Sequence, residues 1–159
     1  MALVAVLLTL GASAFRHYWK VRSVQSAQDD LVSQMKEGLA RAMSESHPRV
    51  YGLRLRPGSG AGASSTWGLV RYDYAAGTCT ELFTRSFEGG AYVSAADFAD
   101  VSPATETCRT QIAGATTDEF VFLFARGSAT AGTVTVRGDG VATTRGVRVD
   151  GITGRVSRL

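Results

Sequence analysis

Hydrophobic and polar positions divide the chain into two parts with different periods. Residues 2–15 form an uncharged run, and the apolar residues beyond it recur at three- and four-residue steps: Val21, Val24, Ala27, Leu31, Met35, Leu39 and Ala42. Steps of this size place side chains on one face of an α-helix. Since no proline occurs between Ala2 and Ser46, the pattern predicts one helix over residues 1–46, extending roughly 65 Å at about 1.5 Å per residue. Part of such a helix must project beyond a small domain.

Beyond residue 47 the apolar period changes to that of a β-strand. Tyr51, Leu53 and Leu55 alternate with glycine and arginine, which predicts a half-buried strand. The next expected elements are a flexible loop over residues 57–65, a hairpin formed by 66–74 and 80–87, and a strand at 91–93. The mixed, polar residues 94–117 predict irregular structure, with 108–112 as a candidate strand.

The last third of the chain predicts the most buried strand and the closing hairpins. Residues 120–124 are apolar at every position, so we expect a central strand covered on both faces. Residues 133–137 alternate with Val134 and Val136 inward, and residues 138–140 predict a tight turn with positive φ. The final strands are expected to carry Val147, Val149, Ile152 and Val156.

Together these elements predict an α+β fold, in which a long N-terminal helix packs against an antiparallel β-sheet head. The helix comprises residues 1–46, apolar over 1–16 and amphipathic over 17–46, and the head comprises residues 47–159 as a meander. The side chains expected to pack the helix on the head are Val24, Leu31, Met35 and Leu39.

Composition narrows the function classes. A chain of 159 residues supports one compact domain besides the helix, and 45% hydrophobic residues exclude a disordered protein. The net charge of +3 is compatible with an anionic partner but does not require one. If the head lies outside the cytoplasm, Cys79 and Cys108 are expected to form a disulfide, because both stand beside threonines in polar sequence; two separate buried thiols are the alternative.

No catalytic or metal-binding pattern is present in the sequence. His17 and His47 have no cysteine or carboxylate at metal-ligand spacing, and the glycine-rich residues 58–62 lack the lysine and hydroxyl of a phosphate-binding loop. Four carboxylates in the polar segments are interpreted as solvated loop residues rather than acid–base pairs: Asp97, Asp100, Asp118 and Glu119. We therefore expect a protein that is not an enzyme and has no cofactor.

Arginines gather near the C-terminus, at Arg145, Arg148, Arg155 and Arg158. If some of them share one face of a terminal hairpin, they can hold phosphates by charge and forked hydrogen bonds. The favoured alternative is that they fill the exposed face of an edge strand and protect it from aggregation.

The uncharged N-terminal run resembles a membrane segment that is too short. It is followed by Arg16, His17, Lys20 and Arg22, with Tyr18 and Trp19 between them, and this mixture is typical of a membrane boundary. A complete span needs about 20 apolar residues. Either the run is a secretory signal cleaved after Ala14, or it is a retained anchor completed by residues upstream of Met1.

Several segments, taken in order, resemble the GspH/FimT-type minor pilins and pseudopilins of type IV pili and type II secretion systems. The end of the helix with its Ala40-Arg41 pair, the Pro48-Arg49-Val50 strand start, Trp67-Gly68-Leu69-Val70, residues 122–136 and the closing Gly154-Arg155-Val156 are similar to that family's pattern. The family's basic leader, glycine and Phe-Thr-Leu-Ile-Glu do not occur in this chain. Met1 is therefore expected to be an internal methionine that directly follows that glutamate.

The resemblance implies a pilin-like fold and a structural role. The helix would hold the subunit in the cytoplasmic membrane with the head outside the cytoplasm, and would then pack into a periplasmic or extracellular filament. Its partners would be other pilins or pseudopilins and the inner-membrane assembly platform. The residues expected to pack in the membrane or filament core are Leu3, Val4, Val6, Leu7, Leu8, Leu10 and Gly11.

The resemblance also implies a second possibility, DNA binding at a pilus tip. Some relatives bind DNA through a C-terminal Gly-Arg-x-Arg motif. In this chain the second arginine is one place late, in Gly154-Arg155-Val156-Ser157-Arg158.

Overall fold

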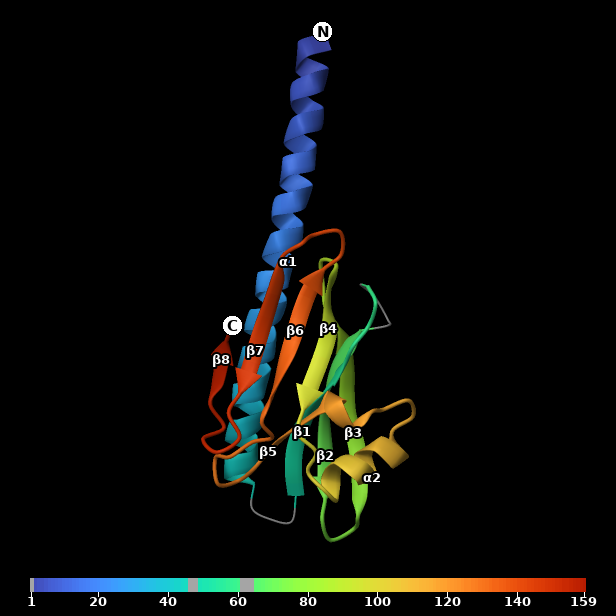
Figure 1. The fold of residues 1–159 in the computed structure, drawn as a ribbon, viewed down its shortest axis with the longest axis vertical. Coiled ribbons are helices and arrows are strands. Elements are labelled where there is room, and N and C mark those ends of the chain that lie inside the picture. Colours follow the sequence, from blue (N-terminus) through green and yellow to red (C-terminus); the bar gives the residue numbers. More distant parts are fainter. Residues whose placement is uncertain (1, 46–48, 61–64) are drawn as a thin grey trace.

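The computed structural model describes residues 2–45, 49–60 and 65–159. It shows one long helix, α1 (Ala2–Ser44), whose C-terminal half lies against a head of two antiparallel sheets and whose N-terminal half projects from it (Figure 1). The fold is therefore α+β, and its shape is compatible with that of a pilin.

The first sheet has the strand order β3-β2-β1-β5. Its strands are β1 (Arg49–Arg56), β2 (Thr66–Asp73), β3 (Thr78–Ser86) and β5 (Phe120–Leu123). Each neighbouring pair is antiparallel, and β1 lies between β2 and β5. A β-bulge interrupts the pairing of β2 with the edge strand β3 between Leu69 and Val70.

The second sheet has the strand order β4-β6-β7-β8. Its strands are β4 (Ala91–Phe98), β6 (Gly132–Gly138), β7 (Thr144–Val149) and β8 (Val156–Arg158). The chain thus leaves the first sheet after β3, returns to it for β5 and then completes the second sheet.

The main hydrophobic core lies between α1 and both sheets. From the helix, Val24, Leu31 and Met35 are completely buried, with Leu39 partly buried beside them. They meet Leu53, Leu55, Trp67, Val121 and Leu123 of the first sheet and Val93, Val134, Val136, Val147 and Val149 of the second. Gly38 allows the helix to approach closely, because a Cβ there would lie 2.7 Å from Cδ1 of Leu123.

A second core covers the other face of the first sheet. The short helix α2 (Ala104–Gln111) packs Ala104, Cys108 and Ile112 against that face. The strand residues that receive them are Val50, Val70, Tyr72, Phe120 and Phe122. A disulfide joins Cys108 to Cys79 on the edge strand β3, and Gln111 accepts a hydrogen bond from the Cys79 N–H and donates one to the Gly77 carbonyl. The sequence expectation of a disulfide is confirmed.

Other local expectations agree with the structure as well. The helix ends at Ser44, and β2 and β3 form the expected hairpin. Val134 and Val136 are completely buried, and Gly140 has a φ of +70°. Part of the flexible loop predicted over 57–65 lies outside the described residues, and His47 lies outside them as well.

The expectation for residues 94–117 was wrong. β4 continues to Phe98, and the candidate strand at 108–112 is instead part of α2 and its C-terminal cap. The physical reason is visible in the chain, since Ala104, Cys108 and Ile112 recur at four-residue steps that suit one face of a short helix.

Other strand predictions need correction. The head is two sheets rather than one meander, and residues 120–123 form an edge strand, although both of its faces are covered. The strand at Tyr51–Leu55 is buried on both faces rather than one, because α2 covers the side away from α1. Ile152 lies in a turn and is 88% exposed.

A buried ion pair explains why Arg54 can occupy an inner position of β1. Its Nε donates a hydrogen bond of 3.0 Å to Oε2 of Glu119, and its Nη1 lies 3.6 Å from Oε2 of Glu81. Arg54 and Glu119 are 6% and 5% exposed, so the interpretation of Glu119 as a solvated loop carboxylate was wrong. Asp97, Asp100 and Asp118 are exposed, as expected.

We expect Glu119→Gln to destabilise the head by about 3 kcal/mol, because breaking a buried ion pair leaves the arginine charge insufficiently compensated. Urea unfolding of the full chain in mild detergent measures this change. The control is Glu37→Gln, which removes the exposed partner of Arg41 and should cost less than about 0.5 kcal/mol. Equal losses in the two variants would contradict this account.

Candidate functional site

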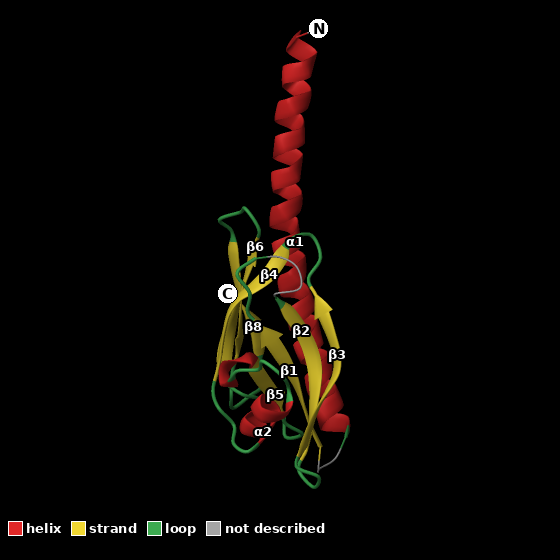
Figure 2. Cartoon of the chain, turned by 90° about the vertical axis from the view of Figure 1, so that its right-hand side faces the viewer, coloured by secondary structure: helices red, strands yellow, loops and turns green. Residues whose placement is uncertain are grey.

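The N-terminal half of α1 projects from the head (Figures 1 and 2). Phe15, Tyr18 and Trp19 are 61%, 62% and 57% exposed, and the rings of Phe15 and Trp19 meet edge to face with centroids 5.8 Å apart. Among the described residues, no helix is long and apolar enough to cross a membrane. The backbone of Leu3, Val4, Val6, Leu7, Leu8, Leu10 and Gly11 belongs to α1, whereas their side chains lie outside the described part.

One polar residue lies inside the apolar face of the helix and holds the end of the chain. Gln28 is 2% exposed, and its Nε2 donates hydrogen bonds of 2.6 Å to the Gly146 carbonyl and 3.4 Å to the Leu159 carbonyl. Arg158 adds an ion pair of 2.8 Å with Asp29 on the same helix. The C-terminal strand β8 is therefore attached to α1 by side chains as well as to β7.

The C-terminal arginines do not form one basic face. In the pairing of β7 with β8, Arg148 lies opposite Ser157 and Val147 opposite Arg158, so the side chains of Arg148 and Arg158 lie on opposite faces of the sheet. Arg145, opposite the buried Val136, shares the helix-facing side with Arg158. Each of these arginines is exposed, as is Arg155, but Arg158 is already paired with Asp29.

The turn that precedes Arg155 is organised by Asp150. Its carboxylate accepts hydrogen bonds from the N–H groups of Ile152 and Thr153 and from the Thr153 hydroxyl. The Thr153 N–H above all, together with the other two donors, lowers the pKa of Asp150 below its ordinary value of 3.8. Gly154 follows with a φ of +61°, and a Cβ there would collide with the Gly127 carbonyl. The turn therefore requires a glycine at Gly154, the first residue of the closing Gly-Arg-Val.

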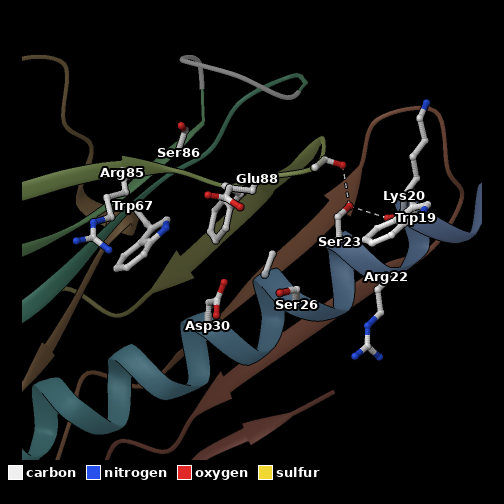
Figure 3. A pocket seen from close by; sticks show the side chains of 13 residues that line it. Trp19, Lys20, Arg22, Ser23, Ser26, Asp30, Trp67, Arg85, Ser86 and Glu88 are labelled. Atoms are coloured by element: carbon white, nitrogen blue, oxygen red, sulfur yellow. Dashed lines mark hydrogen bonds between the residues drawn. The ribbon is translucent and has the colours of Figure 1, made fainter. Parts of the chain in front are cut away.

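A groove of about 490 Å³ opens where α1 leaves the head (Figure 3). One wall is the helix from Trp19 to Asp30, and the other is formed by Trp67 of β2 and the turn from Arg85 to Gly89. The Ser23 hydroxyl closes one end by donating a hydrogen bond of 2.8 Å to the Gly89 carbonyl. The walls combine aromatic rings with charges of both signs.

Two carboxylates lie on opposite walls of this groove. Asp30 comes from α1 and Glu88 from the turn between β3 and β4, and within the described part of the chain neither forms an ion pair or a hydrogen bond. Burial raises the pKa of Asp30, and the negative charges of Asp29 and Glu88 raise it further. The groove thus holds two solvent-exposed carboxylates together with three cations, Lys20, Arg22 and Arg85.

Sequence reasoning did not identify Gln28, Asp30 or Glu88. A signal existed for Gln28, because it follows Ala27 within the apolar stripe where a polar residue must find a partner. No local pattern identifies the groove, since its walls come from distant segments, α1 on one side and Trp67 with residues 85–89 on the other, which meet only in the folded molecule.

No family model, curated protein or solved structure matches this chain. Over residues 2–45, 49–60 and 65–159, no group of three or more histidine, cysteine, aspartate or glutamate side chains has a geometry that could hold a metal ion. The site is therefore characterised by its surfaces: the exposed half of α1 and the groove at its base.

We expect Gln28→Leu to loosen the C-terminal strand, because the Gly146 and Leu159 carbonyls each lose a side-chain hydrogen bond and keep only their backbone donors, at a cost of about 0.5–1.5 kcal/mol. Hydrogen exchange of Val156–Arg158 in the full chain should become faster, and the unfolding midpoint should fall. Gln25→Leu, on the exposed side of the same helix, is the matched control. Unchanged exchange in Gln28→Leu would contradict a role in holding β8.

The Asp150 turn predicts a pH dependence. Because the pKa of Asp150 is lower in the folded than in the unfolded state, its stabilising effect is complete above about pH 4 and is lost as the pH falls through the folded pKa. Urea midpoints between pH 7 and pH 2 should therefore decrease less steeply in Asp150→Asn than in the unmodified chain. Asp139→Asn, in the exposed β6–β7 turn, should retain the original acid slope, and so should Asp150→Asn if the turn contributes nothing.

Proposed function

We propose that this protein is a structural subunit of a pilus-like filament, of the minor pilin or pseudopilin kind, held in the cytoplasmic membrane before assembly. One observation carries the proposal: a single helix packs against the head and then projects from it as a segment whose sequence is uncharged and apolar. An apolar helix that projects in this way is stabilised by lipid or by neighbouring helices around it.

The change in exposure along α1 supports this division of roles. Val24, Leu31 and Met35 are completely buried in the head, whereas Phe15, Tyr18 and Trp19, which precede Val24 by about one to three turns, are more than half exposed. Aromatic rings together with Arg16, Lys20 and Arg22 suit the boundary between an apolar layer and water. The disulfide of the head suits an oxidising compartment outside the cytoplasm.

The two alternatives have less support. DNA binding at a tip requires several arginines on one face, and the register of β7 and β8 divides Arg148 from Arg158. A secreted domain cleaved after Ala14 would keep the head, but it would leave the exposed aromatic turn from Phe15 to Trp19 without a role.

The proposal is tested by locating the protein and its N-terminus. When the complete gene is expressed in a bacterial host, the protein should remain in the membrane pellet after carbonate extraction. Leu8→Lys should shift most of it to the soluble fraction or prevent its export, because a lysine near the centre of an apolar helix costs about 2.5–3.5 kcal/mol. Gln25→Lys, on the exposed side of the head portion of α1, should have no effect.

Sequencing of the mature N-terminus separates the anchor from a cleaved signal. We expect residues 1–14 to be retained in the mature protein. A soluble exported protein that begins at Phe15 would refute the proposal.

A further inference from the structure

The groove at the base of the projecting helix holds cations and carboxylates at different places along α1. Lys20 and Arg22 lie at the end nearest the projecting segment, whereas Asp30 lies about 12 Å beyond Arg22 along the helix. Glu88 comes from the opposite wall (Figure 3). All four side chains are exposed, and over residues 2–45, 49–60 and 65–159 no ion pair involves any of them.

The two carboxylates share one part of the groove. Burial raises the pKa of Asp30, and the negative charges of Asp29 and Glu88 raise it further. The third cation of the lining, Arg85, lies over the ring of Phe83, with its Cζ 5.1 Å from the ring centroid. The part of the groove beside Asp30 and Glu88 is therefore suited to a small cationic group, such as an ammonium with its three N–H donors.

One hydrogen bond brings the cationic end of the groove close to this part. The Ser23 hydroxyl donates to the Gly89 carbonyl at 2.8 Å, so the turn that carries Glu88 lies against the helix one residue beyond Arg22. Figure 3 shows the side chains of Lys20 and Arg22 extended away from the carboxylates, so the positive and negative ends stay separate. A ligand with a negative and a positive group a short distance apart matches both ends.

The position of the groove relative to the apolar run indicates where such a ligand comes from. The uncharged residues 2–15 are followed by Tyr18 and Trp19, 62% and 57% exposed, and aromatic side chains of this kind lie at membrane–water boundaries. The headgroup layer extends roughly 5–7 Å beyond the hydrocarbon on each side, and the helix rises about 4.5 Å from Trp19 to Arg22. Under the proposed function, Lys20 and Arg22 therefore lie at the depth of lipid headgroups.

We propose that the groove binds the phosphoethanolamine headgroup of a membrane phospholipid, with the phosphate on Lys20 and Arg22 and the ammonium on Glu88 and Asp30. This inference rests on the proposed function, which places the apolar helix in the membrane. In such a lipid the phosphate is nearer the acyl chains and the ammonium forms the outer end, which is the order of the cations and carboxylates along α1. A purely anionic headgroup brings no cation to the two carboxylates and is the poorer match.

Tryptophan fluorescence measures this binding, because both tryptophans of the chain, Trp19 and Trp67, line the groove. The full-length protein in maltoside micelles is titrated with phosphatidylethanolamine, phosphatidylcholine or phosphatidylglycerol. We expect half-saturation with phosphatidylethanolamine at a mole fraction roughly fivefold lower than with the other two, because only this headgroup joins a phosphate to a primary ammonium. Equal responses to the three lipids, or a preference for phosphatidylglycerol, would overturn the inference.

Neutralising variants assign the two halves of the headgroup. Asp30→Asn with Glu88→Gln should remove the preference for phosphatidylethanolamine over phosphatidylglycerol. Lys20→Gln with Arg22→Gln should weaken the binding of both lipids by roughly fivefold, because the phosphate loses its charged donors. These side chains are exposed, and an unchanged unfolding midpoint verifies that the variants fold. A preference that survives the loss of both carboxylates contradicts the assignment.

Two controls complete the titration. Lys36→Gln with Glu37→Gln, exposed on α1 outside the groove, should bind all three lipids as the unmodified chain does. Free O-phosphoethanolamine has the same two charged groups without acyl chains, and at equal concentration it should change the fluorescence far less. An equal response to the free compound would overturn the assignment to a lipid.

Carbonate extraction of cells that express the protein reports separately on the proposed function. A membrane-bound chain that shows no preference among the lipids refutes the headgroup site alone. A soluble chain refutes the proposed function, and with it the membrane setting on which this inference rests.

Discussion

The structure depends on the burial of one face of α1 between two sheets. The inner leucines of β1 and the inner valines of β6 and β7 belong to one core together with Val24, Leu31 and Met35 of the helix. The C-terminal half of α1 thus covers both sheets. A displacement of α1 along its axis would expose apolar side chains of both sheets at once.

Polar contacts fix the position of α1 along its axis relative to the two sheets. Gln28 donates hydrogen bonds near the C-terminus, Asp29 forms an ion pair with Arg158, and the Ser23 hydroxyl donates to the Gly89 carbonyl. All of these partners come from distant parts of the chain. A purely apolar face could slide by one turn at modest cost, whereas the buried Gln28 would then lose both of its acceptors. The height at which the exposed half of α1 begins is fixed in this way, and so is the position of the groove relative to the basic segment.

The sequence was sufficient for features that depend on local periodicity, and it failed where distant segments meet. The three- and four-residue steps predicted α1 and its buried positions, and two-residue steps predicted the hairpins. The alternation of β1 predicted that one face of the strand is exposed to solvent. Nothing in residues 49–56 indicates that α2 and Glu119 cover that face. α2 was missed because its three apolar contacts are separated by polar residues, three of which are threonines with weak helix propensity. The groove could not be predicted, since it exists only where the turn after β3 approaches α1.

The proposed function also bears on the basic residues that follow the apolar run. Positive residues beside a membrane segment favour the cytoplasmic side, whereas the disulfide favours a head in an oxidising compartment. Under the proposed function, Arg16, Lys20 and Arg22 would therefore lie on the side of the membrane where the distribution of positive charge alone would select against them.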